Sequence, residues 1–218
     1  MDKDNDKDED EDTDDDEKEK KPTKKTVFEW EQVNPQKALW LRATENVNEN
    51  EYNEFYQFIF KDYFDPLAYM HFNAEREIEF KSILCLPRKA PFDMMDNYWQ
   101  KKSEIKLHGR RVLVADKLED LLPRHLNSVR GVVDSDDLPL NESHEQPQPN
   151  KIVKEISKKL ARKVLEQMKK LAREDDSGES EDAGKMNEET TWSKIYTEFA
   201  KNLKMGCYED DSNRSKFS

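Results

Sequence analysis

Three stretches of the chain carry apolar side chains every three or four residues, which is the spacing of one face of an α-helix. They span residues 52–59, 151–173 and 192–199. Asn48 and Glu51 form a capping-box pair in front of the first stretch, so we expect that helix to begin after Asn48. In the second stretch, nine basic and two acidic side chains cover the polar faces. The pattern therefore predicts three helices, of which the middle one is strongly basic.

Strand-like stretches lie mainly between the first two predicted helices. Residues 78–86 (IEFKSILCL) predict a strand that Pro87 closes, and residues 105–115 predict a second strand. Residues 131–141 (GVVDSDDLPLN) predict the end of a strand followed by an acidic loop. Near the start, residues 27–30 (VFEW) alternate apolar and charged side chains at strand spacing.

Two further sequence signals mark a break in regular structure and the start of a helix. The pair Asp65-Pro66 predicts an interruption of regular structure. Asp116 with Glu119 predicts the N-terminus of a short helix through the leucines of 118–122. Together, the predicted helices and strands indicate a mixed domain of the α/β type.

Charge is unevenly distributed along the 218 residues, which carry 37 basic and 49 acidic side chains. The first 25 positions hold 13 acidic and 7 basic side chains, a net charge of −6 out of the total of −12. Residues 174–189 hold eight acidic side chains and one lysine. Neither segment can bury enough apolar surface to offset the entropy of ordering its backbone. We therefore expect a disordered charged linker over 1–26, at the start of a piece of a longer protein, and a flexible insertion over 174–189.

Several classes of protein are excluded by composition. No apolar run approaches the roughly 20 residues of a membrane span, and the acidic start lacks the basic and apolar regions of a signal peptide. Cys85 and Cys207 are too few for a disulfide framework or a zinc site. The sequons at Asn141 and Asn213 are short enough to arise by chance and do not decide whether either asparagine is glycosylated.

The sequence contains no complete motif for catalysis or for nucleic-acid binding. Gly178 and Gly184-Lys185 imitate a phosphate-binding loop, but the spacing is one residue too long and the surroundings are acidic. The acidic N-terminal segment lacks the glycine of a calcium loop. The basic helix carries no aromatic side chains that could stack on bases, so we expect no nucleic-acid partner, and no membrane partner either. The four histidines are too scattered to bind a metal.

Ten short segments resemble, in order, the middle domain of the 90-kDa heat-shock chaperone family. The most specific of them is RGVVDSDDLPLN at 130–141. The others are LWLRA (39–43), EYNEFYQFI (51–59), DPLAYMHFNAE (65–75), FKSIL (80–84), P-x-x-APFD (87–93), IKL (105–107), RRV (110–112), KNLKMG (201–206) and EDDSNR (209–214). The resemblance covers 27–218, and KTVFEWE (25–31), AYMHF (68–72) and EDDSNR look most like the endoplasmic-reticulum member of the family.

The resemblance implies a fold and a division into parts. Members of the family have an α+β middle domain, an α-β-α sandwich resembling domain 2 of ribosomal protein S5, followed by a helical segment and a smaller α-β-α unit. For this chain the resemblance implies a large subdomain over 27–150, a helical segment over 151–203 that contains the acidic insertion, and the start of the next subdomain over 204–218.

The resemblance also implies a role in the whole protein. Members of the family are homodimeric clamps that bind client proteins and hydrolyse ATP, held with magnesium by an N-terminal domain that this chain lacks. We therefore expect clients and the N-terminal ATP-binding domain as partners, a monomer for this piece alone, and a location in the endoplasmic-reticulum lumen, with the cytoplasm as the alternative. Trp40 stands where the family has an aromatic residue implicated in client contact, although it could equally pack under the helix at 49–61.

The family's middle domain contributes a loop to ATP hydrolysis in which an arginine reaches the γ-phosphate. Here that loop reads LNESHEQPQPNK (140–151), with Ser143 and Gln148 matching the family but His144 in place of the arginine and Pro149 in place of a second glutamine. Histidine is mostly neutral at pH 7 and lacks the forked donors of arginine. The resemblance thus assigns His144 and Gln148 to the loop, and the replacement predicts slow turnover unless another residue serves the phosphate.

Two hypotheses remain for the function. The first is a chaperone middle domain that binds clients and is coupled to ATP hydrolysis. The second is an acidic module that binds basic partners without ATP. Deleting residues 1–25 distinguishes them, because binding to basic partners should be lost and should depend steeply on salt, whereas client binding should survive.

Overall fold

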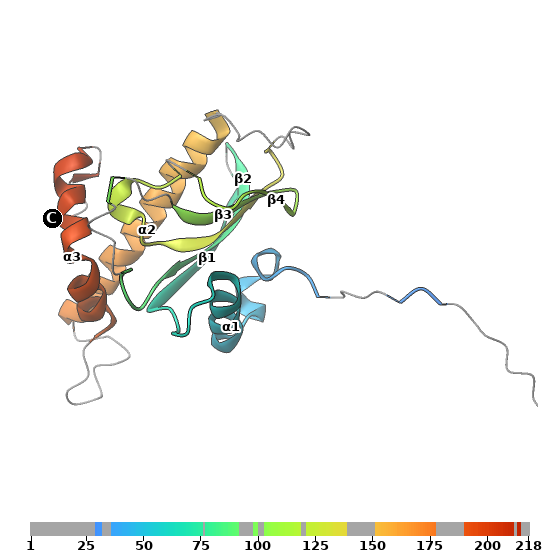
Figure 1. Ribbon diagram of the computed structural model, residues 1–218, viewed down its shortest axis with the longest axis horizontal. Helices are drawn as coiled ribbons and strands as arrows, with labels where there is room; N and C mark the ends of the chain where they lie inside the picture. Colours follow the sequence, from blue (N-terminus) through green and yellow to red (C-terminus); the bar gives the residue numbers. More distant parts are fainter. Residues whose placement is uncertain are drawn as a thin grey trace, which may run out of the picture. The chain divides into compact units, whose positions relative to one another are not determined.

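The structure is a computed structural model that describes residues 29–31, 36–75, 77–91, 98–99, 103–118, 121–138, 151–177, 190–211 and 213–214 (Figure 1). The chain divides into two units, Met1–Pro35 and Gln36–Ser218. In the first unit, Glu29–Glu31 has no regular structure, and the rest of the strand predicted at 27–30 and the acidic segment of 1–26 lie outside the described residues. The second unit contains all the helices and strands described below.

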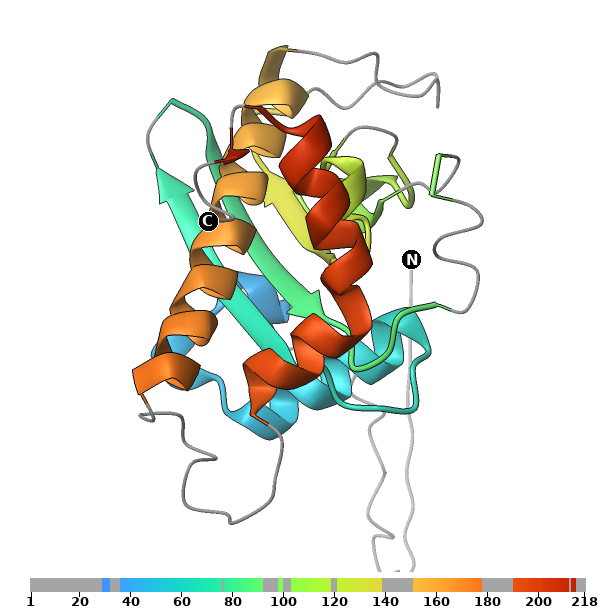
Figure 2. The same cartoon turned by 90° about the vertical axis from the view of Figure 1, so that its left-hand side faces the viewer.

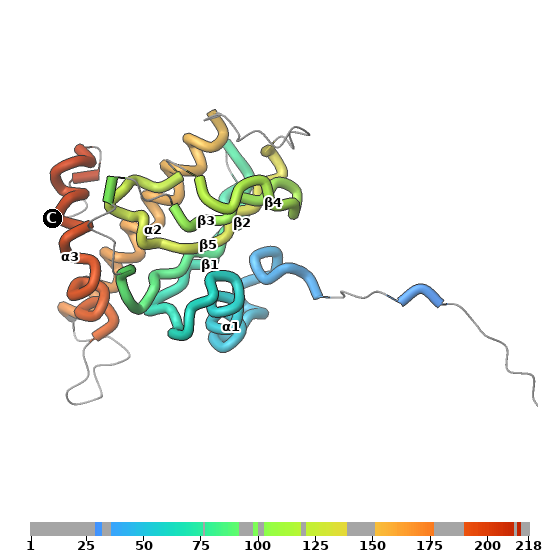
Figure 3. The backbone as a smooth tube through the Cα atoms, viewed as in Figure 1, coloured from blue at the N-terminus to red at the C-terminus, as the bar shows by residue number. Residues whose placement is uncertain are grey.

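The centre of the second unit is a five-stranded mixed sheet in the order β1-β2-β5-β3-β4. Its strands are β1 (Ala68–Glu75), β2 (Glu79–Leu86), β3 (Glu104–Gly109), β4 (Val112–Ala115) and β5 (Arg130–Ser135). Strand β5 lies between β2, to which it is antiparallel, and β3, to which it is parallel. Figure 3 traces the path from β3 through β4 and the 3₁₀ turn η3 (Arg124–Leu126) back to β5.

Helices cover both faces of the sheet, in three layers (Figures 1 and 2). Because side chains alternate along a strand, β2 serves both faces: Phe80 and Leu84 join one core, and Ile83 and Cys85 join the other. The first core lies against α2 (Lys151–Ser177) and α3 (Thr191–Glu209), and the second against α1 (Glu49–Phe60). The α+β fold class predicted from the resemblance is confirmed.

Helix α1 begins where the capping pair predicted. The Asn48 side chain accepts the backbone N–H of Glu51 at 2.9 Å, and the Glu51 carboxylate accepts the N–H of Asn48 at 3.0 Å. Lys61, with φ at 52°, ends the helix in the left-handed conformation. On its buried side, Tyr52 and Tyr56 face the sheet as the helical spacing predicted.

Helices α2 and α3 are longer than predicted. Helix α2 continues through Ser177, so the first four residues of the flexible insertion expected over 174–189 are helical, and residues 178–189 lie outside the described part. Helix α3 begins after Thr190, whose side chain accepts the N–H of Ser193 at 3.1 Å. It runs without a break across the boundary expected between 203 and 204. The subdomain limits remain predictions, but both helices pack on the core of the sheet.

The single strand predicted over 105–115 is wrong. The segment is a hairpin of β3 and β4, and its turn is formed by Arg110 and Arg111, with φ of 48° and 69°. Turns of this kind usually carry Asn or Gly, which adopt positive φ at little cost. Hydrogen bonds hold the arginines instead: Arg110 N–H donates to Ser135 O at 3.3 Å, and Arg111 N–H donates to Asp134 Oδ1 at 3.1 Å.

The short helix predicted after Asp116 is also wrong in its described residues. Leu118 forms an antiparallel bridge with Ser103, and Leu121 and Leu122 lie in a bend before η3. Both of these leucines are buried in the main core. The burial of these two adjacent leucines therefore decided the local structure, and the predicted cap at Asp116 did not.

Strand β1 was not predicted from the sequence. It follows the predicted break at Asp65-Pro66 and pairs along its full length with β2, from Ala68 opposite Leu86 to Glu75 opposite Glu79. Its sequence AYMHFNAE does alternate, with Ala68, Met70, Phe72 and Ala74 packed on the main core. Two of these four side chains are alanines and only Met70 is buried, so the strand signal was present but weak.

Candidate functional site

Trp40, predicted to contact clients or to pack under α1, lies in the 3₁₀ turn η1 (Leu39–Leu41). Its ring packs edge-on against Phe55 of α1, with centroids 6.1 Å apart, and lies 5.2 Å from the ring of His108 on β3. Its indole N–H donates to Asp134 Oδ2 at 2.9 Å. The side chain is half-buried, so it packs between α1 and the sheet, and a role in client contact remains a prediction.

Asp134 joins Trp40 to the β3–β4 hairpin. Its two carboxylate oxygens accept different donors, the Trp40 indole N–H on Oδ2 and the Arg111 backbone N–H on Oδ1. Burial lowers the pKa of neighbouring His108, although the negative charge of Asp134 opposes this shift. The carboxylate thus fixes a segment near the start of the domain to a turn about 70 residues further along the chain.

The other residues of the motif RGVVDSDDLPLN have structural roles as well. A Cβ on Gly131 would lie 2.4 Å from the backbone oxygen of Ile83, so β5 can approach β2 this closely only with glycine there. The Ser135 hydroxyl donates to Glu79 O at 2.7 Å, and Asp137 accepts the Glu79 N–H at 2.9 Å. The motif therefore fixes the end of β5 against the start of β2.

This fixed end leads directly into the segment that contains the predicted γ-phosphate loop. Residues 139–150, with His144 and Gln148, lie outside the described part of the chain. Leu138 before the segment and Val153 after it are both buried in the main core. The described residues on both sides of the segment therefore belong to the packed domain.

A buried ion network on the α1 face connects the sheet to the loop after α1. Arg130 of β5 donates through Nε to Glu104 at 2.6 Å and through Nη1 to Asp62 at 2.8 Å. The Tyr56 hydroxyl donates to Asp62 at 2.8 Å, and burial raises the pKa of Tyr56. Burial would lower the pKa of Arg130, but adjacent Glu104 and Tyr56 keep it above its usual value. The network holds a permanent cation in place between α1 and the sheet.

Large aromatic side chains are exposed at the C-terminal end of α1. Phe58 is 83% exposed and Tyr63 is 94% exposed, with Phe64 at 44% beside them in the chain. Sequence reasoning did not single out these residues, but Phe58 falls off the apolar stripe of α1, and this position was the available signal. Because exposed apolar surface can mark an interaction site, we define Phe58, Tyr63 and Phe64, which lie within seven residues of one another in the chain, as the α1 aromatic surface.

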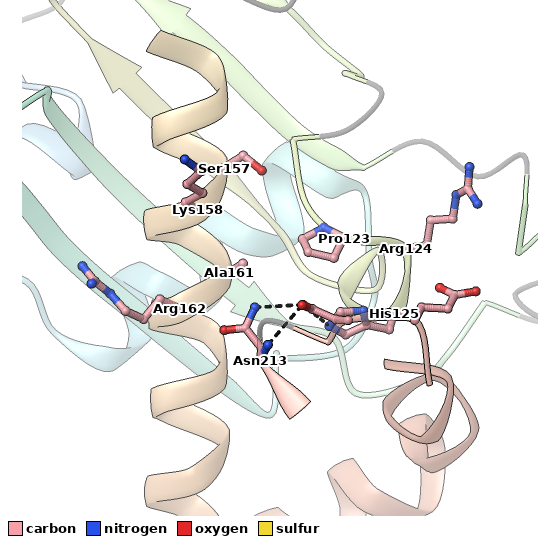
Figure 4. A pocket seen from close by; sticks show the side chains of 10 residues that line it. Pro123, Arg124, His125, Ser157, Lys158, Ala161, Arg162 and Asn213 are labelled. Carbon is pink, nitrogen blue, oxygen red and sulfur yellow. Dashed lines mark hydrogen bonds and ion pairs between the residues drawn. The ribbon is translucent and has the colours of Figure 1, made fainter. Parts of the chain in front are cut away.

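A second candidate is a pocket of about 570 Å³ between η3, α2 and α3 (Figure 4). At its centre, Asp210 Oδ2 accepts the Asn213 amide at 2.8 Å and lies 3.9 Å from His125 Nε2. Burial lowers the pKa of His125, while Asp210 and Glu209 oppose the shift. Figure 4 shows Arg124 and Arg162 extending away from this centre. Arg124 instead lies over the Trp99 ring at 5.1 Å, so the cations of the pocket do not converge on one ligand position.

Metal-binding clusters and membrane-spanning helices are both absent from the described residues. No group of three or more His, Cys, Asp or Glu side chains among them is placed to hold a metal ion. None of the described helices is both long enough and apolar enough to cross a membrane.

The chain is similar to several known proteins over most of its length. It is 44% identical to an endoplasmin homolog from Caenorhabditis elegans and 43% identical to one from Arabidopsis thaliana, each over 91% of the chain. An endoplasmin homolog from Catharanthus roseus is 42% identical over the same share. The chain covers 24%, 25% and 26% of these three proteins, so it spans about a quarter of the length of the relatives it matches.

A solved structure and a family model agree with these relatives. The middle domain of a Plasmodium falciparum heat shock protein superimposes with a TM-score of 0.67 at 31% identity, covering 83% of this chain and 64% of that one. The family model described as Hsp90 protein matches residues 1–218. The layered α+β fold, the motif at 130–141 and these matches lead to one conclusion: the chain belongs to the Hsp90 family and is endoplasmin-like.

Proposed function

We propose that this chain is the middle segment of an ATP-driven chaperone and that it binds clients and transmits ATP hydrolysis from an N-terminal domain. The observation that carries the proposal is the match of its fold to a heat-shock middle domain. In this proposal, ATP and magnesium are held by the N-terminal domain of the full-length protein, which acts as a homodimer in the endoplasmic-reticulum lumen. Endoplasmin-like relatives support the compartment by similarity.

The α1 aromatic surface is the position at which we place client binding. Phe58 and Tyr63 present apolar rings to solvent within six residues of one another, which suits extended, partly unfolded polypeptides. Trp40 packs against Phe55, which lies one turn before Phe58 on the same helix, and so supports the helix that carries Phe58. In this arrangement Trp40 affects clients through the position of α1.

A pair of matched substitutions tests the client surface. Tyr63→Ser removes an exposed ring beside α1, and Tyr208→Ser removes an 81% exposed ring from α3. We expect Tyr63→Ser, alone or with Phe58→Ser, to weaken suppression of the aggregation of a chemically denatured protein, measured by light scattering. Tyr208→Ser should leave suppression unchanged. Equal losses in both variants would show that any exposed ring suffices and would contradict the assignment to this surface.

For ATP coupling, we propose that the loop containing His144 and Gln148 reaches the γ-phosphate in the closed full-length clamp. The residues on either side of the loop, Leu138 and Val153, are buried in the main core. A neutral histidine stabilises a transferring phosphoryl group far less than an arginine does, and loss of such a contact costs on the order of 10³-fold in rate.

The experiment is to introduce His144→Arg into the full-length chaperone and to measure ATP turnover. We expect turnover to rise by at least about tenfold, since a fixed cation replaces a mostly neutral ring. Gln148→Ala should lower turnover in the same protein. An unchanged rate with His144→Arg would mean that another residue serves the phosphate, and it would leave the test of client binding unaffected.

A further inference from the structure

Helices α2 and α3 lie side by side on one face of the sheet (Figure 2). Residues of both helices line a groove of about 420 Å³. Its floor is apolar, formed by Leu165, Met168 and Leu203 with Trp192 at one end. The first three of these are buried, and Trp192 is partly exposed. The accessible apolar surface of the groove therefore comes mainly from Ala172, Trp192 and Tyr196, which are partly exposed above the buried floor.

The rim of the groove is basic. Lys169 and Arg173 stand one turn apart on α2, and Lys204 of α3 faces them with its Nζ 5.9 Å from the Tyr196 ring. Asp176 is the one acidic side chain among the lining residues, which leaves a net charge of +2.

These basic side chains differ from others on α2. Lys158, Lys163 and Lys170 each pair with a glutamate on the same helix at 2.8–3.5 Å. Within the described part of the chain, no carboxylate lies at ion-pair distance from Lys169, Arg173 or Lys204. The outer lysines of α2 thus pair with glutamates, whereas Lys169 and Arg173 have no ion-pair partner among the described residues and Lys204 lies over the Tyr196 ring.

The dimensions of the groove limit what can occupy it. From Leu165 to Asp176 it follows α2 for roughly 16 Å, at 1.5 Å per residue of helix. An extended peptide rises about 3.3 Å per residue, so about five residues fill this length. Charge complementarity requires carboxylates on a ligand whose apolar side chains rest on the floor.

We propose that the α2–α3 groove binds a short extended peptide of a partner protein in which large apolar side chains alternate with Asp or Glu. This binding site is separate from the α1 aromatic surface, because α1 covers the opposite face of the sheet. It needs neither ATP nor the loop at 139–150. The preferred ligand is a defined acidic and apolar sequence, whereas unfolded clients vary in sequence.

Cys207 provides a direct readout, because it lines the groove and is partly exposed. The other thiol, Cys85, is fully buried, and burial raises its pKa to about 12, so it should not react in the folded chain. The rate of alkylation by N-ethylmaleimide therefore reports on the groove alone. A seven-residue peptide of alternating Leu and Glu, with fluorescein attached, is the probe, and the same peptide with Lys in place of Glu is its control.

We expect the Leu-Glu peptide to bind the 218-residue chain and to slow the alkylation of Cys207, and the Leu-Lys peptide to do neither. Lys169→Glu combined with Lys204→Glu should weaken binding at least about tenfold, because each reversal replaces an attraction by a repulsion. Lys170→Glu is the matched control, since Lys170 is on the same helix but outside the groove lining, and it should change affinity less than about twofold. Ala172→Glu places a carboxylate in the groove and should abolish binding. Glutamate is a good helix former, so the substitution should leave α2 intact.

Several results would overturn the proposal. These are equal binding of the two peptides, equal losses in the Lys170→Glu and Lys169→Glu/Lys204→Glu variants, or unchanged Cys207 alkylation in the presence of bound peptide. Absence of binding at about 1 mM peptide would also overturn it. Binding that appears only after residues 179–188 are replaced by a Gly-Ser linker would make the chain's own acidic segment the occupant. Binding to this chain but not to the full-length protein would assign the groove to an internal contact.

Discussion

At the scale of single residues, the most specific sequence motif of the chain has mainly structural roles. Asp134 and Ser135 use their side chains to tie β5 to Trp40, to the β3–β4 hairpin and to the start of β2. Gly131 allows the two central strands to approach. None of these partners could be found from the spacing of residues, because Trp40 and Asp134 are 94 positions apart. The motif thus fixes the strand that precedes the segment at 139–150.

The first prediction concerns Gly131. Gly131→Ala should lower the free energy of unfolding by about 1–3 kcal/mol, since the new Cβ would lie 2.4 Å from a backbone oxygen that cannot move aside without disturbing β2. Urea unfolding measures this as a lower midpoint with an unchanged slope. Leu84→Ala in the same chain should not restore the loss, because the obstacle is the Ile83 backbone more than the Leu84 side chain. A Gly131→Ala variant of unchanged stability would show that β2 and β5 can separate freely.

At the scale of elements, the helices were predictable and the hairpin was not. Each helix has an apolar stripe that its burial requires, and Asn48 marks the start of α1. The β3–β4 turn uses two arginines at positive φ, which sequence patterns associate with the interior of a strand as readily as with a turn. Strand β1 was missed for a different reason: its apolar side chains do alternate with polar ones, but two of the four are alanines and only Met70 is buried. The apolar pattern was clear where one face of an element is wholly buried, as in the helices. It did not reveal the β3–β4 turn, because contacts with distant residues decide the conformation there.

The second prediction concerns this turn. Replacing Arg110-Arg111 by Asn-Gly should stabilise the domain by up to about 1 kcal/mol, because residues that tolerate positive φ relieve the backbone of the turn. The backbone hydrogen bonds to Ser135 and Asp134 need no arginine side chain and should remain. Thermal unfolding shows whether the substitution raises the stability of the domain, as we expect, or lowers it. A clear loss of stability would mean that the bond from the Arg110 side chain to Asp136 O, at 3.3 Å, contributes more than the strain.

At the scale of the whole molecule, three histidines lie at separate points of the second unit, His125 buried and His71 and His108 partly buried. Burial lowers the pKa of His71, His108 and His125. His71 is also held between the Tyr52 hydroxyl, 2.7 Å from Nδ1, and the Trp40 carbonyl, 3.4 Å from Nε2. A neutral ring satisfies both contacts if the hydroxyl donates to Nδ1 and Nε2–H donates to the carbonyl. Protonation therefore disturbs the native state on both faces of the sheet.

The third prediction follows from these histidines. Below the unfolded pKa of about 6.5 the unfolded chain takes up protons that the native chain does not, so stability falls as pH falls from 7.5 to 5.5. Carboxylates remain ionised over this range and contribute little. Urea unfolding at the two pH values should show the decrease, and His71→Gln should reduce it. A free energy of unfolding independent of pH would show that these rings gain protons in the folded state as easily as in the unfolded one.

The position of β5 at the centre of the sheet has a consequence for how the chain is made. Strands β1 and β2 form one ribbon and β3 and β4 form another, each from neighbouring segments, whereas the strand that joins the two ribbons is the last of the five to be synthesised. Until residue 135 has left the ribosome, the inner edges of β2 and β3 have no strand to pair with. A nascent chain of this domain therefore carries an open edge on β2 from residue 86 and a second one on β3 from residue 109, and both stay open until β5 is complete at residue 135. During this part of synthesis the unpaired edges can pair with strands of other chains.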